Sequence, residues 1–184
     1  MMRRGFVSDT RGAATAEFVL WLAVIIVPFL SVIDLGVFAF QRMQLEIAGQ
    51  AAAQAVWGSC DMTKSPTRLP ATRNCASLLS TITTAAQATS LGTSVTVPAG
   101  SPVEGYYCTN GSNALVVVGA TGTIAAPLTA TRPNCSTVTP GSTTPAGDYI
   151  QVTVNYPYTP VFAGVSLASL LPSTITRTAW MRLR

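Results

Sequence analysis

The chain has 184 residues, a formal net charge of +4 and 10% charged residues, against about 25% in typical soluble domains. It contains no histidine and no glycine-rich phosphate loop with a lysine, which argues against histidine-dependent catalysis and nucleotide chemistry. Basic and aromatic residues do not interleave, which argues against nucleic-acid binding. We therefore expect no enzyme, no cofactor and no nucleic-acid partner.

An apolar run extends from Phe18 to Phe40 and reads FVLWLAVIIVPFLSVIDLGVFAF. About 20 residues at 1.5 Å each cross a hydrocarbon core of roughly 30 Å, and the run is longer than a usual signal-peptide core. Three arginines precede it (Arg3, Arg4 and Arg11), and no similar cluster follows closely. The positive-inside rule then predicts a single span over about residues 17–40, with the N-terminus cytoplasmic and the C-terminal part outside.

Helical periodicity continues beyond the span, from Gln41 to Trp57. The sequence QRMQLEIAGQAAAQAVW places an apolar stripe at helical spacing, made of Leu45, Ala48, Ala51, Ala52, Ala55 and Val56. We expect one long helix over residues 13–57, with its outer half packed on a soluble domain or a neighbouring subunit. Pro28 is tolerated because membrane helices accept an interrupted hydrogen bond.

Four cysteines lie beyond the predicted span: Cys60, Cys75, Cys108 and Cys135. An oxidising compartment favours disulfides, each worth about 2–4 kcal/mol. Four cysteines allow three pairings, and we favour Cys60–Cys75 with Cys108–Cys135 because sequential pairs close short loops. A metal site is disfavoured because the chain has neither histidine nor closely spaced cysteines.

The remaining elements are shorter. Residues 77–91 predict a second helix that Asn74 could cap, while 94–98 and 114–118 predict short strands. Residues 149–156 alternate, with one face made of Ile150, Val152 and Val154. Residues 178–184 alternate too, with Ala179, Met181 and Leu183 inward. Residues 161–171 fit a short helix or an apolar loop. Together they predict an α+β fold in which a small antiparallel sheet, within an outer domain of residues 58–184, packs on the long helix.

The four acidic residues beyond the membrane are scattered along the sequence: Glu46, Asp61, Glu104 and Asp148. Their spacing does not predict a carboxylate pair. Tyrosines at 106–107 and 156–158 favour buried core positions over an exposed binding surface.

Glu17 is a single carboxylate at the entrance of the apolar run. A lone carboxylate in a membrane helix costs about 2.5–3.5 kcal/mol, so a partner is expected. A cut between Gly12 and Ala13 would create a free amine and make Glu17 the fifth residue. That amine could pair with Glu17 of the next subunit. A basic leader of residues 1–12, Gly12 before the cut, then Glu17 and Phe18, resemble the processing site of type IV prepilins.

The opening RRGFVSDTRGAATAEFVLWLAVIIVPFLSVIDLGVFAF resembles TadE/TadF-like minor pilins of tight-adherence (Tad) pili over residues 1–57. The closing DYIQVTVNYPYTPVF and ITRTAWMRLR are similar in style. The resemblance implies cleavage by a prepilin peptidase, residence in the bacterial inner membrane with a periplasmic domain, and other pilins as partners through the N-terminal helix. It also implies a role in pilus assembly, initiation or adhesion, with the extracellular pilus as a further location.

Two other functions stay open. One is a bitopic membrane protein with an extracytoplasmic binding domain that is not processed as a pilin. The other is a secreted domain released by signal peptidase I at the small residues Ala48–Ala55, which ranks last because such a cut lies well beyond a normal signal core.

Overall fold

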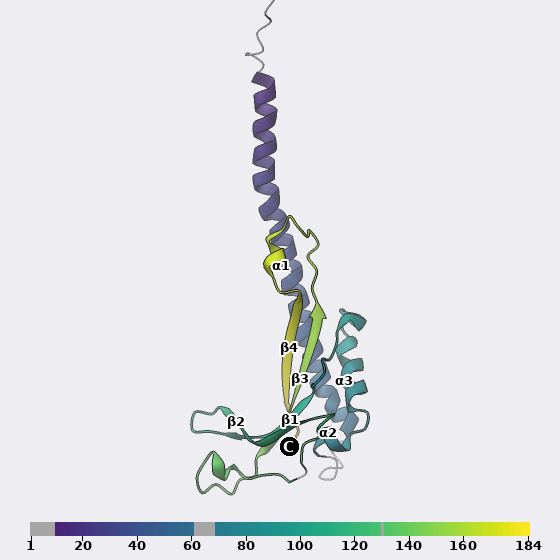
Figure 1. The fold of residues 1–184 in the computed structure, drawn as a ribbon, viewed down its shortest axis with the longest axis vertical. Coiled ribbons are helices and arrows are strands. Elements are labelled where there is room, and N and C mark those ends of the chain that lie inside the picture. The colour runs from purple at the N-terminus through teal and green to yellow at the C-terminus, as the bar shows by residue number, and fades with distance from the viewer. Residues whose placement is uncertain (1–9, 61–68, 130) are drawn as a thin grey trace, which may run out of the picture. The chain divides into compact units, whose positions relative to one another are not determined.

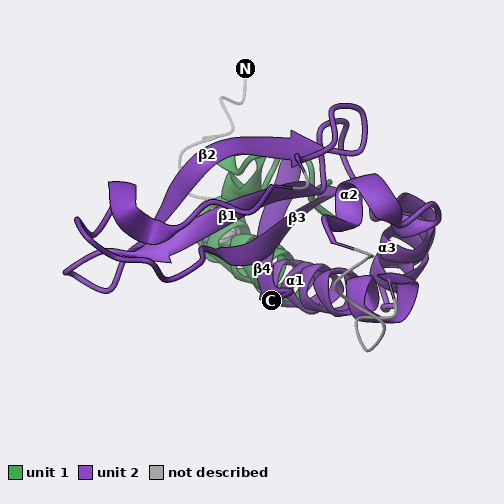
Figure 2. Ribbon diagram, turned by 90° about the horizontal axis from the view of Figure 1, so that it is seen from below, with its two compact units in different colours: residues 1–40, 158–173 green, residues 41–157, 174–184 purple. Residues whose placement is uncertain are grey.

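The computed structural model describes residues 10–60, 69–129 and 131–184, without the side chains of residues 10–14 and 23. It divides the chain into two compact units (Figure 2). The first unit comprises residues 1–40 and 158–173, and the second comprises residues 41–157 and 174–184. Most of the predicted leader, residues 1–9, lies outside the described residues.

Helix α1 (Thr10–Cys60) has 51 residues and continues through Pro28. The expected helix over 13–57 lies within it. Its residues up to Phe40 belong to the first unit, and those from Gln41 belong to the second. The described part of α1 is long and apolar enough to cross a membrane, so the chain has one candidate for a single-pass anchor among its described residues.

In the second unit, α1 packs directly on the sheet. Leu45, Ala48, Ala52 and Val56 of the predicted stripe are fully buried. Gly49 lies so close to the strands that an added Cβ would be 3.4 Å from Val154 Cγ2 and 3.6 Å from Ala179 Cβ. Small side chains therefore let the helix backbone approach the sheet.

The sheet has four antiparallel strands in the order β2-β1-β3-β4 (Figure 1). The strands are β1 (Val103–Thr109), β2 (Leu115–Thr123), β3 (Gly147–Pro157) and β4 (Thr174–Arg182). The predicted α+β class with a long N-terminal helix is confirmed.

Alternation on β3 and β4 follows the sequence pattern. Ile150, Val152 and Val154 have no exposed surface, and Val152 pairs with Ala179 of β4. On β4, Trp180 is half exposed. A period of two thus sends one side of each strand to the helix and the other outward.

Two strand predictions need correction. The strand expected over 94–98 is wrong, because residues 92–94 form a 3₁₀ turn and only Thr96 bridges to Asn155. Strand β1 was not predicted. Its sequence VEGYYCT places Glu104 on the face of Tyr106 and Cys108, where alternation would require an apolar residue, and Gly105 has a low strand propensity, so the strand signal is interrupted.

The helical segment after Cys60 is split into α2 (Ala71–Asn74) and α3 (Leu78–Gln87). Leu78, Ile82 and Ala86 of α3 are buried, as the periodicity predicted. Asn74 is not the cap of this helix. It is the last residue of α2, because the chain turns between the two helices and α3 begins after Ser77.

Two disulfides connect elements of the outer domain. Cys60 at the end of α1 bonds to Cys75 after α2, with their Cα atoms 5.4 Å apart. Cys108 on β1 bonds to Cys135, with their Cα atoms 5.7 Å apart. These are the two pairs that short loop closure favoured. The first joins the short helix α2 to the end of α1, and the second joins the 3₁₀ turn Cys135–Thr137 to β1.

A small core forms under β1 and β2. It contains Tyr106, Cys108, Val118, Leu128 and Ala146. The Tyr106 hydroxyl donates to the Thr129 carbonyl at 2.9 Å, which satisfies its polar end. The backbone at Leu128 packs directly against Gly122 of β2. A Cβ on residue 122 would lie 2.1 Å from the Leu128 backbone nitrogen, so only glycine allows this approach.

Gly122→Ala should therefore displace Leu128 and lower the free energy of unfolding by about 1–3 kcal/mol, the usual range for overpacking. Denaturant unfolding of the full chain in detergent micelles measures the change. Gly111→Ala is the control, because its Cβ would meet nothing within 4 Å, and it should change stability by less than about 0.5 kcal/mol. Equal effects of the two substitutions would contradict the close approach.

Candidate functional site

The predicted processing residues occupy consecutive turns of α1. Gly12 and Ala13 lie within its first turn, after the helix begins at Thr10. Glu17 and Phe18 follow about one turn later, and both side chains are exposed. The helix therefore presents the carboxylate next to the apolar surface rather than burying it within its own chain.

Beyond Phe18, α1 exposes large apolar side chains on all sides. Phe18, Leu20, Trp21, Val24 and Ile25 are each more than 60% exposed. A helix that is apolar all round requires an apolar environment such as lipid or other helices. This part of α1 is suited to a membrane span or to packing against neighbouring helices.

Two polar residues interrupt the apolar run, and both are buried. Asp34 has no exposed surface. Its Oδ1 accepts a hydrogen bond from the Val161 backbone amide at 2.8 Å, and its Oδ2 accepts one from the Phe162 amide at 3.3 Å. The Tyr158 hydroxyl donates to the Asp34 carbonyl at 3.3 Å. Backbone amides thus compensate the carboxylate, as they do at helix N-caps.

Ser31 holds the same segment one turn earlier on the helix. Its hydroxyl donates to the Val27 carbonyl at 2.8 Å and accepts from the Leu167 amide at 3.2 Å. Tyr158 also packs edge-to-face on Phe38, with ring centroids 5.0 Å apart. Residues 158–173 are therefore fastened to α1 at three levels, and we call them the docked loop. This loop contains a 3₁₀ turn, Leu167–Leu170, within the segment expected to be a short helix or an apolar loop.

Sequence reasoning treated Ser31 and Asp34 only as interruptions of the apolar run. Their spacing of three residues carries a usable signal, because it places both on one face of a helix. That signal indicates a polar contact on this face, but it does not identify the partner.

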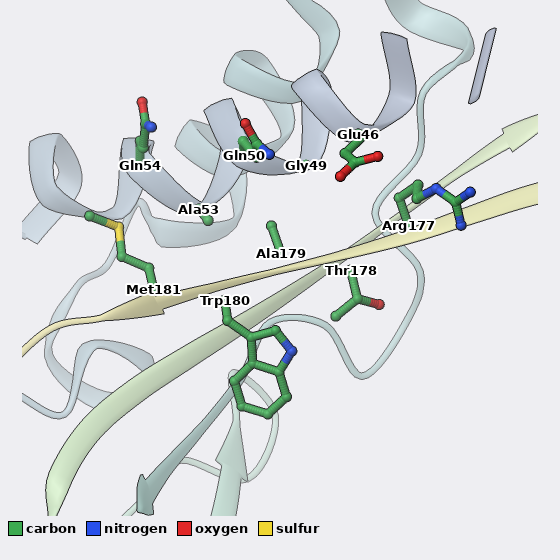
Figure 3. A pocket seen from close by; sticks show the side chains of 10 residues that line it. All are labelled: Glu46, Gly49, Gln50, Ala53, Gln54, Arg177, Thr178, Ala179, Trp180 and Met181. Carbon is green, nitrogen blue, oxygen red and sulfur yellow. The ribbon is translucent and has the colours of Figure 1, made fainter. Parts of the chain in front are cut away.

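A cleft of about 380 Å³ lies between the second part of α1 and the edge strand β4 (Figure 3). Its walls are formed by Glu46, Gly49, Gln50, Ala53, Gln54 and residues 177–181. Ala179 and Met181 point toward the helix, whereas Trp180 points away from it (Figure 3). Small and amide side chains make up more than half of these walls.

A buried carboxyl pair was missed by the sequence reasoning. Glu104 has no exposed surface, and its Oε1 accepts from the Ala71 amide at 2.6 Å. Its Oε2 accepts from the Thr72 amide at 2.8 Å and from the Thr72 hydroxyl at 2.6 Å. These bonds attach α2 to β1. Asp148 on β3 is also buried and hydrogen-bonds to Glu104.

Two adjacent buried negative charges are unfavourable, which favours a proton on Asp148 that is hydrogen-bonded to Glu104. Burial, followed by the charge of Glu104, raises the pKa of Asp148 to about 8. Burial together with the charge of Asp148 also raises the pKa of Tyr106, opposite it on β1, to about 12. A neutral Asp148 that donates to Glu104 holds two strands and α2 together. Both carboxyls are closed to solvent, so their arrangement is structural.

Folding should therefore take up a proton on Asp148, because the ordinary pKa of this carboxyl is 3.8. The stabilisation of the folded state by this proton is fully present below pH 3.8 and is lost as pH rises through about 8. The thermal unfolding midpoint of the wild type, measured in detergent micelles, should therefore decrease between pH 5 and pH 9. In Asp148→Asn this decrease should be smaller, because the residue has no proton to lose. Glu46→Gln, at an exposed carboxylate, should leave the decrease unchanged. Parallel curves for wild type and Asp148→Asn would contradict the shared proton.

Comparison with known proteins identifies one segment. Residues 12–54 match the family model described as TadE-like protein. Searches of curated proteins and of solved structures gave no match. The matched segment begins at Gly12, the residue before the predicted cut, and ends within α1, so the sheet lies outside it. Over its N-terminal helix the chain is therefore similar to TadE-like proteins, and the resemblance predicted from its opening motif is confirmed.

Proposed function

We propose that the chain is a minor pilin of a Tad pilus system, made as a precursor and cleaved between Gly12 and Ala13 by a prepilin peptidase. The observation that carries this proposal is the TadE-like match over residues 12–54. This segment joins the processing motif to the span and to the outer part of α1. The function would be in pilus assembly, initiation or adhesion.

The position of Glu17 supports the pilin role. The carboxylate is exposed beside Phe18 on a helix surface that is otherwise apolar. Packed among other helices, it would need a positive partner. Cleavage supplies one, because the new Ala13 amine of a neighbouring subunit carries a positive charge. This ion pair would set the register between subunits in an apolar bundle.

The exposed apolar surface of α1 supplies the other contacts. Before assembly, lipid of the inner membrane would cover Phe18, Trp21 and their neighbours, with the N-terminus cytoplasmic and the sheet in the periplasm. During assembly, other pilins would replace lipid on this surface. In the second unit, Met43 and Ile47 are also exposed on α1, and they extend the surface available to partner helices.

Processing can be tested on the mature N-terminus. Mass spectrometry of protein extracted from membranes should give a chain that begins at Ala13. Gly12→Val should accumulate at full length, because a side chain at this position crowds the peptidase site. An intact Met1 terminus in piliated cells would contradict the proposal and favour a bitopic protein that is not processed.

Register can be tested separately from processing. Glu17→Ala should still be cleaved and reach the inner membrane, yet pilus yield after shearing should fall strongly. Removing one member of a buried ion pair costs about 3–5 kcal/mol, because the other charge is left uncompensated. Thr143→Ala is the control, since Thr143 is exposed in the second unit and lies outside α1, and it should give normal yield. Normal yield for Glu17→Ala as well would exclude the register role.

A further inference from the structure

The docked loop, residues 158–173, has a surface that is unusual for a connection between strands. Its sequence YTPVFAGVSLASLLPS contains no charged residue. Leu170 is 82% exposed, and Val161, Val165 and Leu167 are each more than half exposed. Four large apolar side chains on one short loop would be costly in water, at about 25 cal/mol per Å² of apolar surface.

The hydrogen bonds to α1 fix the depth of this loop relative to the span. A span of about 20 residues that starts at Phe18, directly after Glu17, ends at Val37. Asp34 then lies about 4.5 Å and Ser31 about 9 Å inside that end, at 1.5 Å per residue. Because Leu167 bonds to Ser31 and Val161 bonds to Asp34, the loop lies at the same depth.

A shorter span would not avoid this consequence. If the hydrocarbon region ended before Ser31, it would contain only the residues from Phe18 to Leu30. These would cover about 20 Å, against a hydrocarbon thickness of about 30 Å.

The backbone of the loop is also suited to an apolar environment. Irregular backbone is not found exposed to lipid within the hydrocarbon region, because its polar groups would be unsatisfied there, so a loop at the boundary of this region needs partners for its amides. Most amides of residues 161–171 have acceptors on Asp34, on Ser31 or within the loop itself. Those with acceptors are Val161, Phe162, Val165, Ser166, Leu167, Ala168, Ser169 and Leu171.

We propose that residues 161–171 lie at the boundary between the headgroups and the hydrocarbon of the leaflet on the C-terminal side of the span, and that Val161, Val165, Leu167 and Leu170 reach its upper acyl chains. The loop and Asp34 enter this leaflet as a unit. The amides of Val161 and Phe162 compensate the carboxylate, and the exposed side chains contact lipid. This inference depends on the single-pass anchor and is independent of cleavage and of pilus assembly.

The test uses the full chain with an environment-sensitive fluorophore on Leu170→Cys, or on Leu167→Cys as a second position. The four native cysteines are held in disulfides, so the new thiol is labelled selectively. The protein is reconstituted at low density in phosphatidylcholine vesicles that carry a doxyl group near the top of the acyl chain. We expect loss of emission with the doxyl lipid and little loss with aqueous iodide.

Two control positions separate the possible failures. A label on Thr143→Cys, exposed in the second unit, should be quenched by iodide and not by doxyl lipid. A label on Val24→Cys, exposed on α1, should be quenched by a doxyl group placed deep in the chain. If Val24 responds to doxyl lipid but Leu170 and Leu167 respond to iodide, the loop is in water and the inference is wrong. Protection of both loop labels from both quenchers would indicate a protein partner and also overturn it. If the label at Val24 is not quenched by doxyl lipid, α1 does not span the membrane and the single-pass anchor is wrong.

Discussion

The contact between the second part of α1 and the strands β3 and β4 is the constraint on which the outer domain depends. A four-stranded sheet must bury one face, and here one helix supplies much of the cover. A Cβ added at Gly49 would lie at ordinary van der Waals distance from Val154 and Ala179, and Leu45 and Val56 complete the core. Because this stripe consists mainly of small residues, the strands can approach closely and their alternation becomes a packed interface.

Two buried acidic sites show different solutions to one physical problem. A buried carboxylate is costly unless its charge is compensated. Asp34 accepts hydrogen bonds from two backbone amides of the docked loop, which give both of its side-chain oxygens a polar partner. Asp148 instead lies next to Glu104, whose oxygens are already occupied by α2. There a shared proton removes one charge, and the pair makes stability depend on pH.

Periodic elements were predictable because many residues contribute to one pattern. The long helix, the alternation on β3 and β4 and the buried face of α3 all followed from spacing. Strand β1 was missed because Glu104 and Gly105 interrupt its pattern. The position of Glu104 is explained only by the fold, in which its carboxylate accepts hydrogen bonds from α2. The strand expected over 94–98 was wrong for the opposite reason. Its alternation is real, yet only Thr96 and Asn155 make a bridge.

Sequence alone was enough to predict the apolar helix, to propose a processing motif around Gly12 and Glu17, and to identify the cysteines available for disulfides. Each of these depends on residues that are neighbours in the chain or on simple composition. Only the tertiary structure decided the partners of Asp34, which lie 127 and 128 residues away at Val161 and Phe162, and those of Glu104. Backbone amides are donors in both cases, joined at Glu104 by the Thr72 hydroxyl, and every residue type except proline carries such an amide. Such partners leave no trace in the sequence, so only the fold can select them.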